Sequence, residues 1–198
     1  MGCLTGISLL VLLFVVGVVA AYLLRAHLIS MKSEQLNPPP VTHGLEAGYD
    51  WRLAPIDGEP QDFAQWRGRP VFLHLWSPRC MACLAEIGSI QRLADKMADT
   101  DIAFVMLTMA YPDNAPAIAA EYGLTLPLYK KAGPLPTLFN TESVPVTFVI
   151  APSGAVAFMH RGAARWDDER VVTWLTRQWG AAETEGASQE GRASPRAE

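Results

Sequence analysis

An uninterrupted apolar run occupies the amino-terminal end of the chain. No charged side chain occurs in residues 1–24, and residues 7–24 are almost wholly aliphatic residues, Phe, Ala and Gly. A helix over this run rises roughly 27 Å, and the residues before it extend it towards the bilayer core thickness of about 30 Å. The pattern therefore predicts a transmembrane anchor over residues 1–25, which ends at Arg25.

A cleaved signal peptide is the alternative for this segment. It normally has a basic region before a shorter apolar core, and here no basic side chain precedes a core that is longer than usual. Arg25 and Lys32 follow the run, while only the α-amino group precedes it. The positive-inside rule would therefore place the carboxyl-terminal body in the cytoplasm.

The rest of the chain divides by composition into three parts. Residues 26–48 contain Pro38-Pro39-Pro40 and little apolar periodicity, which is typical of a semi-rigid linker. Residues 181–198 are mostly Ala, Gly, Ser and Glu, which predicts a disordered tail. One folded domain is expected over residues 49–180.

The apolar pattern inside this domain alternates between strands and helices. Short apolar runs predict strands, and stripes at spacings of three and four residues predict helices. The expected strands are 71–76, 102–108, 145–150 and 155–159, and the expected helices are 80–97, 114–122 and one beginning at Asp167. A helical crossover makes the first strand pair parallel, and a tight turn makes the last pair antiparallel. We expect an α/β domain with a mixed sheet of at least four strands and helices on both faces.

Composition and charge narrow the function. The 198 residues include 16 Lys and Arg against 20 Asp and Glu, for a net charge of −4. A chain of this charge lacks the basic face that binding of nucleic acid requires. With 50% hydrophobic and 18% charged residues it is too apolar for disorder throughout, and three cysteines are too few for a disulfide scaffold.

Cys80 and Cys83 stand where a strand passes into a helix. A helix amino terminus offers free N–H groups and a positive dipole end, and both lower the pKa of a thiol there. Arg79 adds a positive charge beside Cys80. Cys83 is nearly one helical turn further on, so its sulfur can reach that of Cys80. Cys83 should be the less exposed of the two cysteines. A CxxC at such a junction favours disulfide exchange.

Metal binding by the same pair is the main chemical alternative. Half of a structural zinc site would need two more ligands, but the histidines have no paired spacing. A copper-handling module would use the two thiolates as soft ligands. We expect no metal and no organic cofactor. An interaction protein with an incidental CxxC is a further alternative.

The segment Trp76-Ser77-Pro78-Arg79-Cys80-Met81-Ala82-Cys83 resembles the Trp-x-x-x-Cys-x-x-Cys segment of thioredoxin-fold proteins. Over roughly Leu53 to Trp179 the chain is similar to the membrane-tethered TlpA/ResA-like thiol–disulfide oxidoreductases of bacteria, including the ScsD-like branch. Further matching segments are Asp57-Gly58, Gly68-Arg69-Pro70, Val144-Pro145-Val146-Thr147-Phe148 and Pro152-Ser153-Gly154. The resemblance implies a thioredoxin-like fold. The Met-Ala pair between the cysteines departs from the family, which often has a proline there.

The resemblance also implies further site residues. Glu86 falls where many members carry a glutamate near the disulfide, and a buried position would raise its pKa and suit a proton relay. His74 stands where relatives usually have Asn, and its imidazole would serve the proton of the buried cysteine. An exposed surface glutamate and an ordinary core histidine are the alternatives for these two residues.

A cis peptide bond is expected at Pro145, by the same resemblance, and it would expose the backbone of Val144 for pairing with a substrate strand. Leu135-Pro136-Thr137 is a second candidate for such a loop, although no strong apolar strand follows it. Trp76 is expected to lie partly in the core and partly around the site.

The implied activity is dithiol–disulfide exchange with protein substrates. Electrons would come from a membrane thiol transporter of the CcdA, DsbD or ScsB type and reduce periplasmic cysteines, as in cytochrome c maturation or thiol repair. A thiol peroxidase is the alternative within enzymes. The resemblance places the domain in the periplasm on a single-pass inner-membrane anchor, against the local charges.

Overall fold

A computed structural model describes residues 12–23 and 44–180 of the chain. Residues 12–23, within the apolar run, form a helix whose side chains are exposed. Within the described ranges, no helix combines the length and the apolar character that crossing a membrane requires. Both ends of the expected anchor, most of the linker and the expected disordered tail lie outside the described residues.

Residues 44–180 fold around one mixed sheet of seven strands in the order β2-β1-β5-β4-β3-β6-β7. The strands β3, β4 and β5 are parallel, and the remaining neighbours are antiparallel. The bounds are β1 (Arg52–Pro55), β2 (Gln61–Asp62), β3 (Val71–Trp76), β4 (Ala103–Thr108), β5 (Leu128–Lys131), β6 (Val146–Ile150) and β7 (Val156–Arg161).

All four predicted strands are present within one or two residues of their expected bounds. The parallel pairing of β3 with β4 and the antiparallel pairing of β6 with β7 are also confirmed. Three further strands, β1, β2 and β5, were not predicted. They are two to four residues long and mix polar with apolar side chains, so neither an alternating pattern nor an apolar run marks them.

The helices follow their expected order along the chain. They are α2 (Met81–Lys96), α3 (Ala115–Glu121) and α4 (Glu169–Trp179), with short 3-10 turns η1 (Phe63–Trp66) and η2 (Pro112–Asn114). Helix α4 begins two residues after the expected start at Asp167, and its N-cap is Asp168, whose carboxylate accepts a hydrogen bond from the Arg170 N–H. Asn114, the first residue of the expected helix 114–122, is the N-cap of α3, and its side chain makes no capping hydrogen bond within the described residues.

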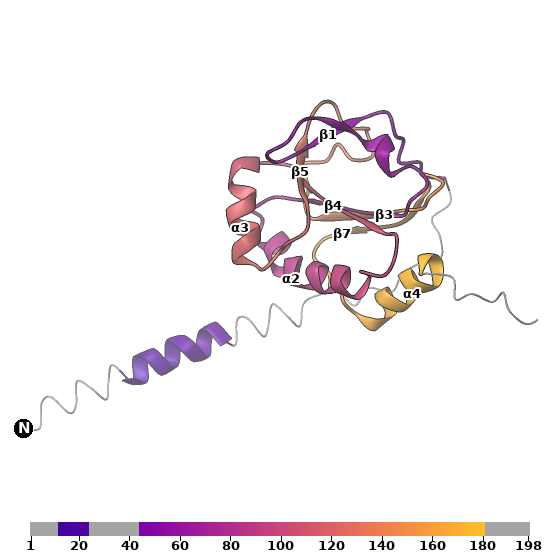
Figure 1. The fold of residues 1–198 in the computed structure, drawn as a ribbon. Helices are drawn as coiled ribbons and strands as arrows, with labels where there is room; N and C mark the ends of the chain where they lie inside the picture. Colours follow the sequence, from indigo (N-terminus) through magenta and orange to yellow (C-terminus); the bar gives the residue numbers. More distant parts are fainter. Residues whose placement is uncertain (1–11, 24–43, 181–198) are drawn as a thin grey trace, which may run out of the picture.

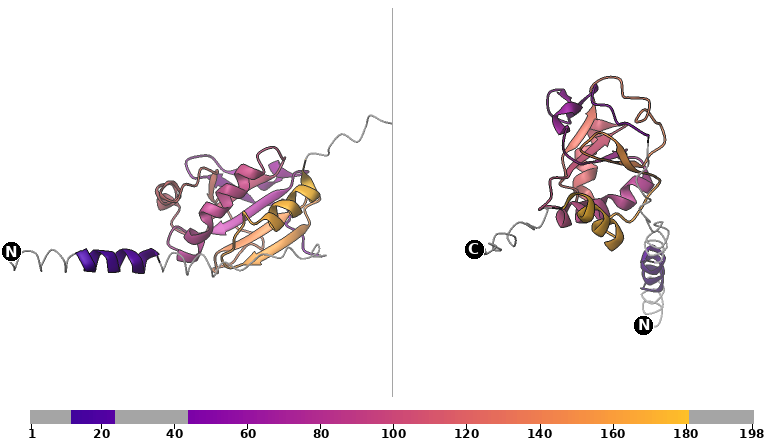
Figure 2. Two further views of the ribbon diagram at one scale, coloured as in Figure 1. Left: turned by 90° about the horizontal axis from the view of Figure 1, so that it is seen from below. Right: turned by 90° about the vertical axis from the view of Figure 1, so that its right-hand side faces the viewer.

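The three α-helices lie on one face of the sheet, so the expectation of α-helices on both faces is wrong (Figure 1). The strands β3, β4 and β5 step in one direction across the sheet. Right-handed crossovers that step in one direction place their helices on the same face, which puts α3 beside α2. The view from below shows α2 and α4 in front of the sheet (Figure 2). Arg92 of α2 forms an ion pair with Asp167, just before α4, at 2.7 Å.

The other face of the sheet is covered by the segment before β3 and by the loop before β6. Trp51, Phe63 and Phe139 pack there against apolar side chains of the central strands. Trp51 and Phe63 are stacked, with ring centroids 4.2 Å apart. The chain already contacts the sheet before Tyr49, because the buried Ala47 donates its N–H to the Gly154 carbonyl oxygen. The folded part therefore begins a few residues earlier than the expected boundary.

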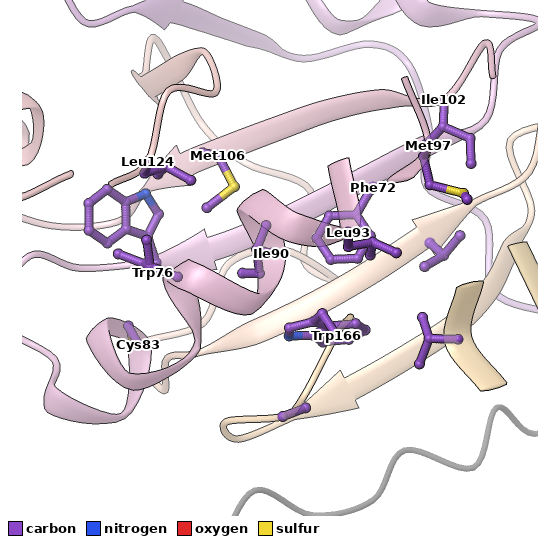
Figure 3. Close-up of a cluster of buried hydrophobic side chains, with 14 of the residues drawn as sticks. Phe72, Trp76, Cys83, Ile90, Leu93, Met97, Ile102, Met106, Leu124 and Trp166 are labelled. Atoms are coloured by element: carbon purple, nitrogen blue, oxygen red, sulfur yellow. The ribbon is translucent and has the colours of Figure 1, made fainter. Parts of the chain in front are cut away.

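The core under the helices joins α2 to the sheet (Figure 3). Phe72 and Trp76 of β3 and Trp166 are almost fully buried in it, and Ile90 and Leu93 of α2 pack against them. Because successive strand residues point to opposite faces, Phe72, His74 and Trp76 of β3 all point towards the helices. This alternation brings a histidine and a tryptophan beneath the start of α2.

Candidate active site

Cys80 and Cys83 form a disulfide bond at the amino terminus of α2, with their Cα atoms 5.2 Å apart. Cys80 is the N-cap residue, and its sulfur accepts a hydrogen bond from the Cys83 N–H at 3.2 Å. β3 ends at Trp76, and the turn that follows carries the chain directly into α2. The Cys80 sulfur thus lies at the positive end of a helix dipole, as the sequence predicts.

The two sulfurs differ in exposure. Cys80 is partly exposed, whereas Cys83 is fully buried in the core under the helices. Figure 3 shows Cys83 in the first turn of α2 at the end of this core, near Trp76. Trp76 is itself 0% exposed, so the expectation that it lies partly around the site is wrong. It supports the first turn from below and does not face solvent.

The loop before β6 lies against Cys80. The peptide bond between Val144 and Pro145 is cis, as expected. The Cys80 sulfur is 3.6 Å from the Val144 carbonyl oxygen. Val144 is partly exposed, so its backbone borders both the sulfur and the surface beside it.

Glu86 is buried on the inner side of α2, at 1% exposure, and is therefore not a surface glutamate. Its Oε2 accepts hydrogen bonds from the Trp166 indole N–H at 2.7 Å and from the Ala164 N–H at 2.9 Å. Burial raises the pKa of Glu86 to about 8, against the lowering effect of these two bonds. The carboxyl group is therefore mostly protonated at neutral pH.

His74 faces Glu86 from the neighbouring strand. Its Nδ1 lies 2.8 Å from Thr147 Oγ1, and its Nε2 lies 3.7 Å from Glu86 Oε1. Burial lowers the pKa of His74 to about 3, so the imidazole is neutral at neutral pH. Among the residues that the structure describes, neither Nε2 of His74 nor Oε1 of Glu86 has a hydrogen-bond partner. Since Oε2 already accepts two bonds, the carboxyl proton belongs on Oε1, where it faces the imidazole.

A cleft of about 430 Å³ opens beside Cys80. Its lining comes from the turn before α2, the segment after β4, the end of β5 and the loop before β6: Ser77, Arg79, Cys80, Met109, Ala110, Lys131, Asn140, Thr141, Glu142 and Val144. The guanidinium of Arg79 lies over the ring of Tyr111, 3.8 Å from its centroid.

Several of these residues were missed from the sequence. Lys131 ends β5, a strand that was itself not predicted, and Tyr111 follows β4. For Tyr111 the available signal was its position after the carboxyl end of a predicted strand, because loops that leave the carboxyl ends of parallel strands gather at one edge of the sheet. For Lys131 the sequence offered no such signal, since its strand was not predicted. Among the residues that the structure describes, no group of three or more His, Cys, Asp or Glu side chains is placed to hold a metal ion.

A disulfide that caps a helix beside a cis-proline loop, on a mixed sheet, defines a thioredoxin-like protein. Residues 46–159 match the AhpC/TSA family, and the chain belongs to that family.

Two relatives carry names that refine this class. The thioredoxin-like protein YneN of Bacillus subtilis is 26% identical over 126 residues, which cover 60% of this chain and 74% of YneN. The thiol-disulfide oxidoreductase ResA of Geobacillus thermodenitrificans is 23% identical over 121 residues, which cover 60% of this chain and 70% of ResA. The expected likeness to TlpA/ResA-like proteins and the enzyme class, thiol–disulfide oxidoreductase, are confirmed.

Solved structures show the same fold. A putative thiol:disulfide interchange protein DsbE from Chlorobium tepidum superposes with a TM-score of 0.59 at 19% identity, over 70% of this chain and 98% of that protein. A secreted Mycobacterium tuberculosis disulfide oxidoreductase homologous to E. coli DsbE gives a TM-score of 0.55 at 23% identity, over 64% of this chain and 96% of that protein. The thioredoxin-like α/β fold is therefore confirmed.

The opposite pKa shifts of His74 and Glu86 predict how stability depends on pH. Between about pH 6.5 and 8 the folded chain keeps a proton on Glu86 that the unfolded chain has released, so the unfolding free energy falls as the pH rises. Buried His74 has the opposite effect, because below about pH 6.5 the unfolded chain binds a proton that the folded chain excludes. Between about pH 6.5 and 4.5 this effect offsets that of Glu86, and below about pH 4.5 it acts alone, so stability falls as the pH drops towards 3.

Urea unfolding of the oxidised chain at a series of pH values measures both the loss of stability at high pH and the loss at low pH. Wild type should lose on the order of 2 kcal/mol between pH 6.5 and 8, and Glu86→Gln should abolish that loss. Parallel profiles for the two proteins would show that Glu86 does not titrate as a buried acid.

Proposed function

We propose that the chain is a membrane-tethered thiol–disulfide oxidoreductase in which Cys80 is the nucleophile and Cys83 the resolving thiol. The observation that carries this assignment is the asymmetry of the pair at the start of α2. The Cys80 sulfur is partly exposed, borders a cleft and accepts the Cys83 N–H, while Cys83 is buried. A sulfur held by a helix amino terminus beside Arg79 is stabilised as a thiolate, which is the reactive form.

The proposed reaction reduces a disulfide of a protein partner. The Cys80 thiolate attacks one sulfur of the partner's disulfide, and the other partner sulfur leaves as a thiolate that takes up a proton. The Cys83 thiolate then attacks the Cys80 sulfur and displaces the second partner sulfur. The partner gains two electrons and two protons, and the Cys80–Cys83 disulfide remains.

Glu86 and His74 are proposed to manage the proton of Cys83. A thiol in apolar surroundings has a raised pKa, so the buried Cys83 needs a base before it attacks. Glu86 is three residues further along α2, on the same side of the helix. In the ionised fraction of Glu86, which grows as the pH rises towards its pKa of about 8, Oε1 can take the proton that Cys83 releases. The neutral His74 presents Nε2 to the carboxyl group that forms, 3.7 Å from Oε1.

Substrate binding is proposed for the surface beside Cys80. The Val144 backbone would pair with an extended partner strand, in the manner of strand addition to a sheet. Arg79, exposed at the mouth of the cleft, would contact the partner as well as favour the thiolate. Trp76 is fully buried, so it would not contact the partner and would instead support the first turn of α2 from the core side.

Location and electron supply complete the proposal. The apolar run of residues 7–24, helical over residues 12–23, would anchor the domain in the inner membrane, with the catalytic domain in the periplasm. There the enzyme would act as a reductant in cytochrome c maturation or thiol repair. A membrane thiol donor of the CcdA, DsbD or ScsB type would reduce its disulfide again.

The division of labour between the cysteines predicts a trapping experiment. Cys83→Ser in the full chain leaves Cys80 able to attack but removes the resolving thiol, so partners should accumulate as mixed disulfides. Non-reducing gels of cells that express this variant should show new bands that a reductant removes. Cys80→Ala and the double variant should show none. If Cys83→Ser traps nothing while Cys80→Ala does, the roles are reversed.

The proton relay predicts a change in the pH–rate profile of the release step. Glu86→Gln keeps an oxygen that accepts the Trp166 N–H but cannot take a proton. Release of a peptide thiol from its mixed disulfide with Cys80 should slow by about 100-fold, the lower end of general acid–base effects, and lose its inflection near pH 8.

Ser89→Ala is the matched control for the relay. Ser89 bonds the same loop, through the Ala164 carbonyl and the Trp166 N–H, but offers no proton acceptor of comparable pKa. This variant should keep the inflection even if the rate falls. Loss of the inflection in Ser89→Ala as well would assign the effect to the loop and not to Glu86.

The topology is tested by alkaline phosphatase fused after residue 198, since that enzyme becomes active only after export. Full-length fusions should be active, and fusions that lack residues 1–25 should be inactive. An intact amino terminus and retention in carbonate-washed membranes would separate an anchor from a cleaved signal peptide. An inactive full-length fusion would place the domain in the cytoplasm, as Arg25 and Lys32 favour.

A further inference from the structure

Two cationic side chains line the cleft beside Cys80 without an ion-pair partner in the described part of the chain. They are Arg79 and Lys131. Neither belongs to any ion pair among the described residues. Five other arginines each face an aspartate within 4 Å: Arg52, Arg69, Arg92, Arg165 and Arg170.

Tyr111 holds Arg79 in place without neutralising it. The guanidinium lies 3.8 Å from the centroid of the ring, a cation–π contact that leaves the charge and most of its N–H donors available. Tyr111 is the one non-glycine residue with a positive φ, 53°, in the described ranges. This left-handed conformation is unfavourable for a bulky residue and persists where the surroundings enforce it. The chain therefore keeps an aromatic ring under Arg79 at a cost in backbone energy.

Exposed apolar surface flanks the same nucleophile. Met81 is 69% exposed and Tyr111 is 47% exposed, the two highest values among the large apolar side chains of residues 44–180. Met81 follows Cys80 directly, and Tyr111 contacts the neighbouring Arg79. Exposed methionine and aromatic side chains beside a reactive group are typical of a surface that contacts another protein.

We propose that this cleft selects partner segments in which a carboxylate lies close to the reacting cysteine, and that Arg79 and Lys131 bind that carboxylate. The proposal rests on the proposed function and names its substrate class. The whole chain carries a net charge of −4 and would repel an acidic partner. Two unpaired cations against the single carboxylate of Glu142 reverse that sign locally.

Symmetric peptide disulfides provide the test. Three short peptides that differ only in the residues flanking a single cysteine, Glu, Gln or Lys, are each oxidised to the disulfide dimer. The reduced full-length chain, in a non-ionic detergent, converts each dimer into two peptide thiols and itself becomes oxidised. Dividing each rate by that of dithiothreitol, whose attacking thiolate has no cationic side chain beside it, removes intrinsic differences between the peptides.

Wild type should reduce the Glu dimer about three- to tenfold faster than the Gln dimer, the range expected for one or two exposed ion pairs. The Lys dimer should be slower than both, and high salt should shrink the differences. Equal relative rates for the three dimers would overturn the inference while leaving the proposed function intact. Reduction of none of them would instead contradict the proposed function.

Single substitutions test whether the preference for the Glu dimer arises from the residues of the cleft. Lys131→Gln removes one cation, and Tyr111→Asn removes the ring while keeping a residue that tolerates a left-handed backbone. Each should lower the ratio of the Glu-dimer rate to the Gln-dimer rate towards one. Tyr111→Phe, which keeps the ring, should retain the wild-type ratio. Arg177→Gln, the same charge change on the exposed side of α4, should leave both rate and ratio unchanged. If Arg177→Gln lowers the ratio as much as Lys131→Gln, the preference arises from net charge and not from the cleft.

Discussion

The hydrogen bond from the Cys83 N–H to the Cys80 sulfur is the contact on which the site depends. It makes a sulfur the N-cap of α2 and places it where unpaired backbone N–H groups and the helix dipole stabilise negative charge. The end of β3 and the loop before β6 limit the directions from which a partner's disulfide could approach the Cys80 sulfur. Exposure of Cys80 and burial of Cys83 then follow from which residues of the first helical turn face the core.

The polar pair beneath this helix is held by the surrounding fold. Glu86 is buried beside an apolar core, and it is tied to the segment before α4 by two hydrogen bonds to one carboxyl oxygen. Its other oxygen faces His74, and both groups are neutral at neutral pH because burial opposes charge on either one. Burying two polar atoms without hydrogen-bond partners lowers the stability of the fold. Their presence beside the cysteine helix is what a role in proton transfer would require.

The surface beside Cys80 is assembled from loops that are distant in sequence. The turn before α2, the segment after β4, the end of β5 and the loop before β6 all meet at one edge of the sheet. The reacting cysteines thus lie on the first turn of α2, whereas most of the residues that would contact a partner lie in the neighbouring loops. This arrangement lets partner preference change without altering the cysteine pair.

Local patterns in the sequence already determine the strand and helix that carry the cysteines and the order of exposure of the two sulfurs. Each of these depends on short-range chemistry, an apolar run or a helix start, whereas the cis-proline loop was expected only from the resemblance to a known family. The short strands β1, β2 and β5, the placement of all three α-helices on one face, the full burial of Trp76, and the grouping of Arg79, Tyr111 and Lys131 were decided only by the tertiary structure. These features depend on strand order and on contacts between distant segments, which the pattern of hydrophobic residues along a chain does not encode.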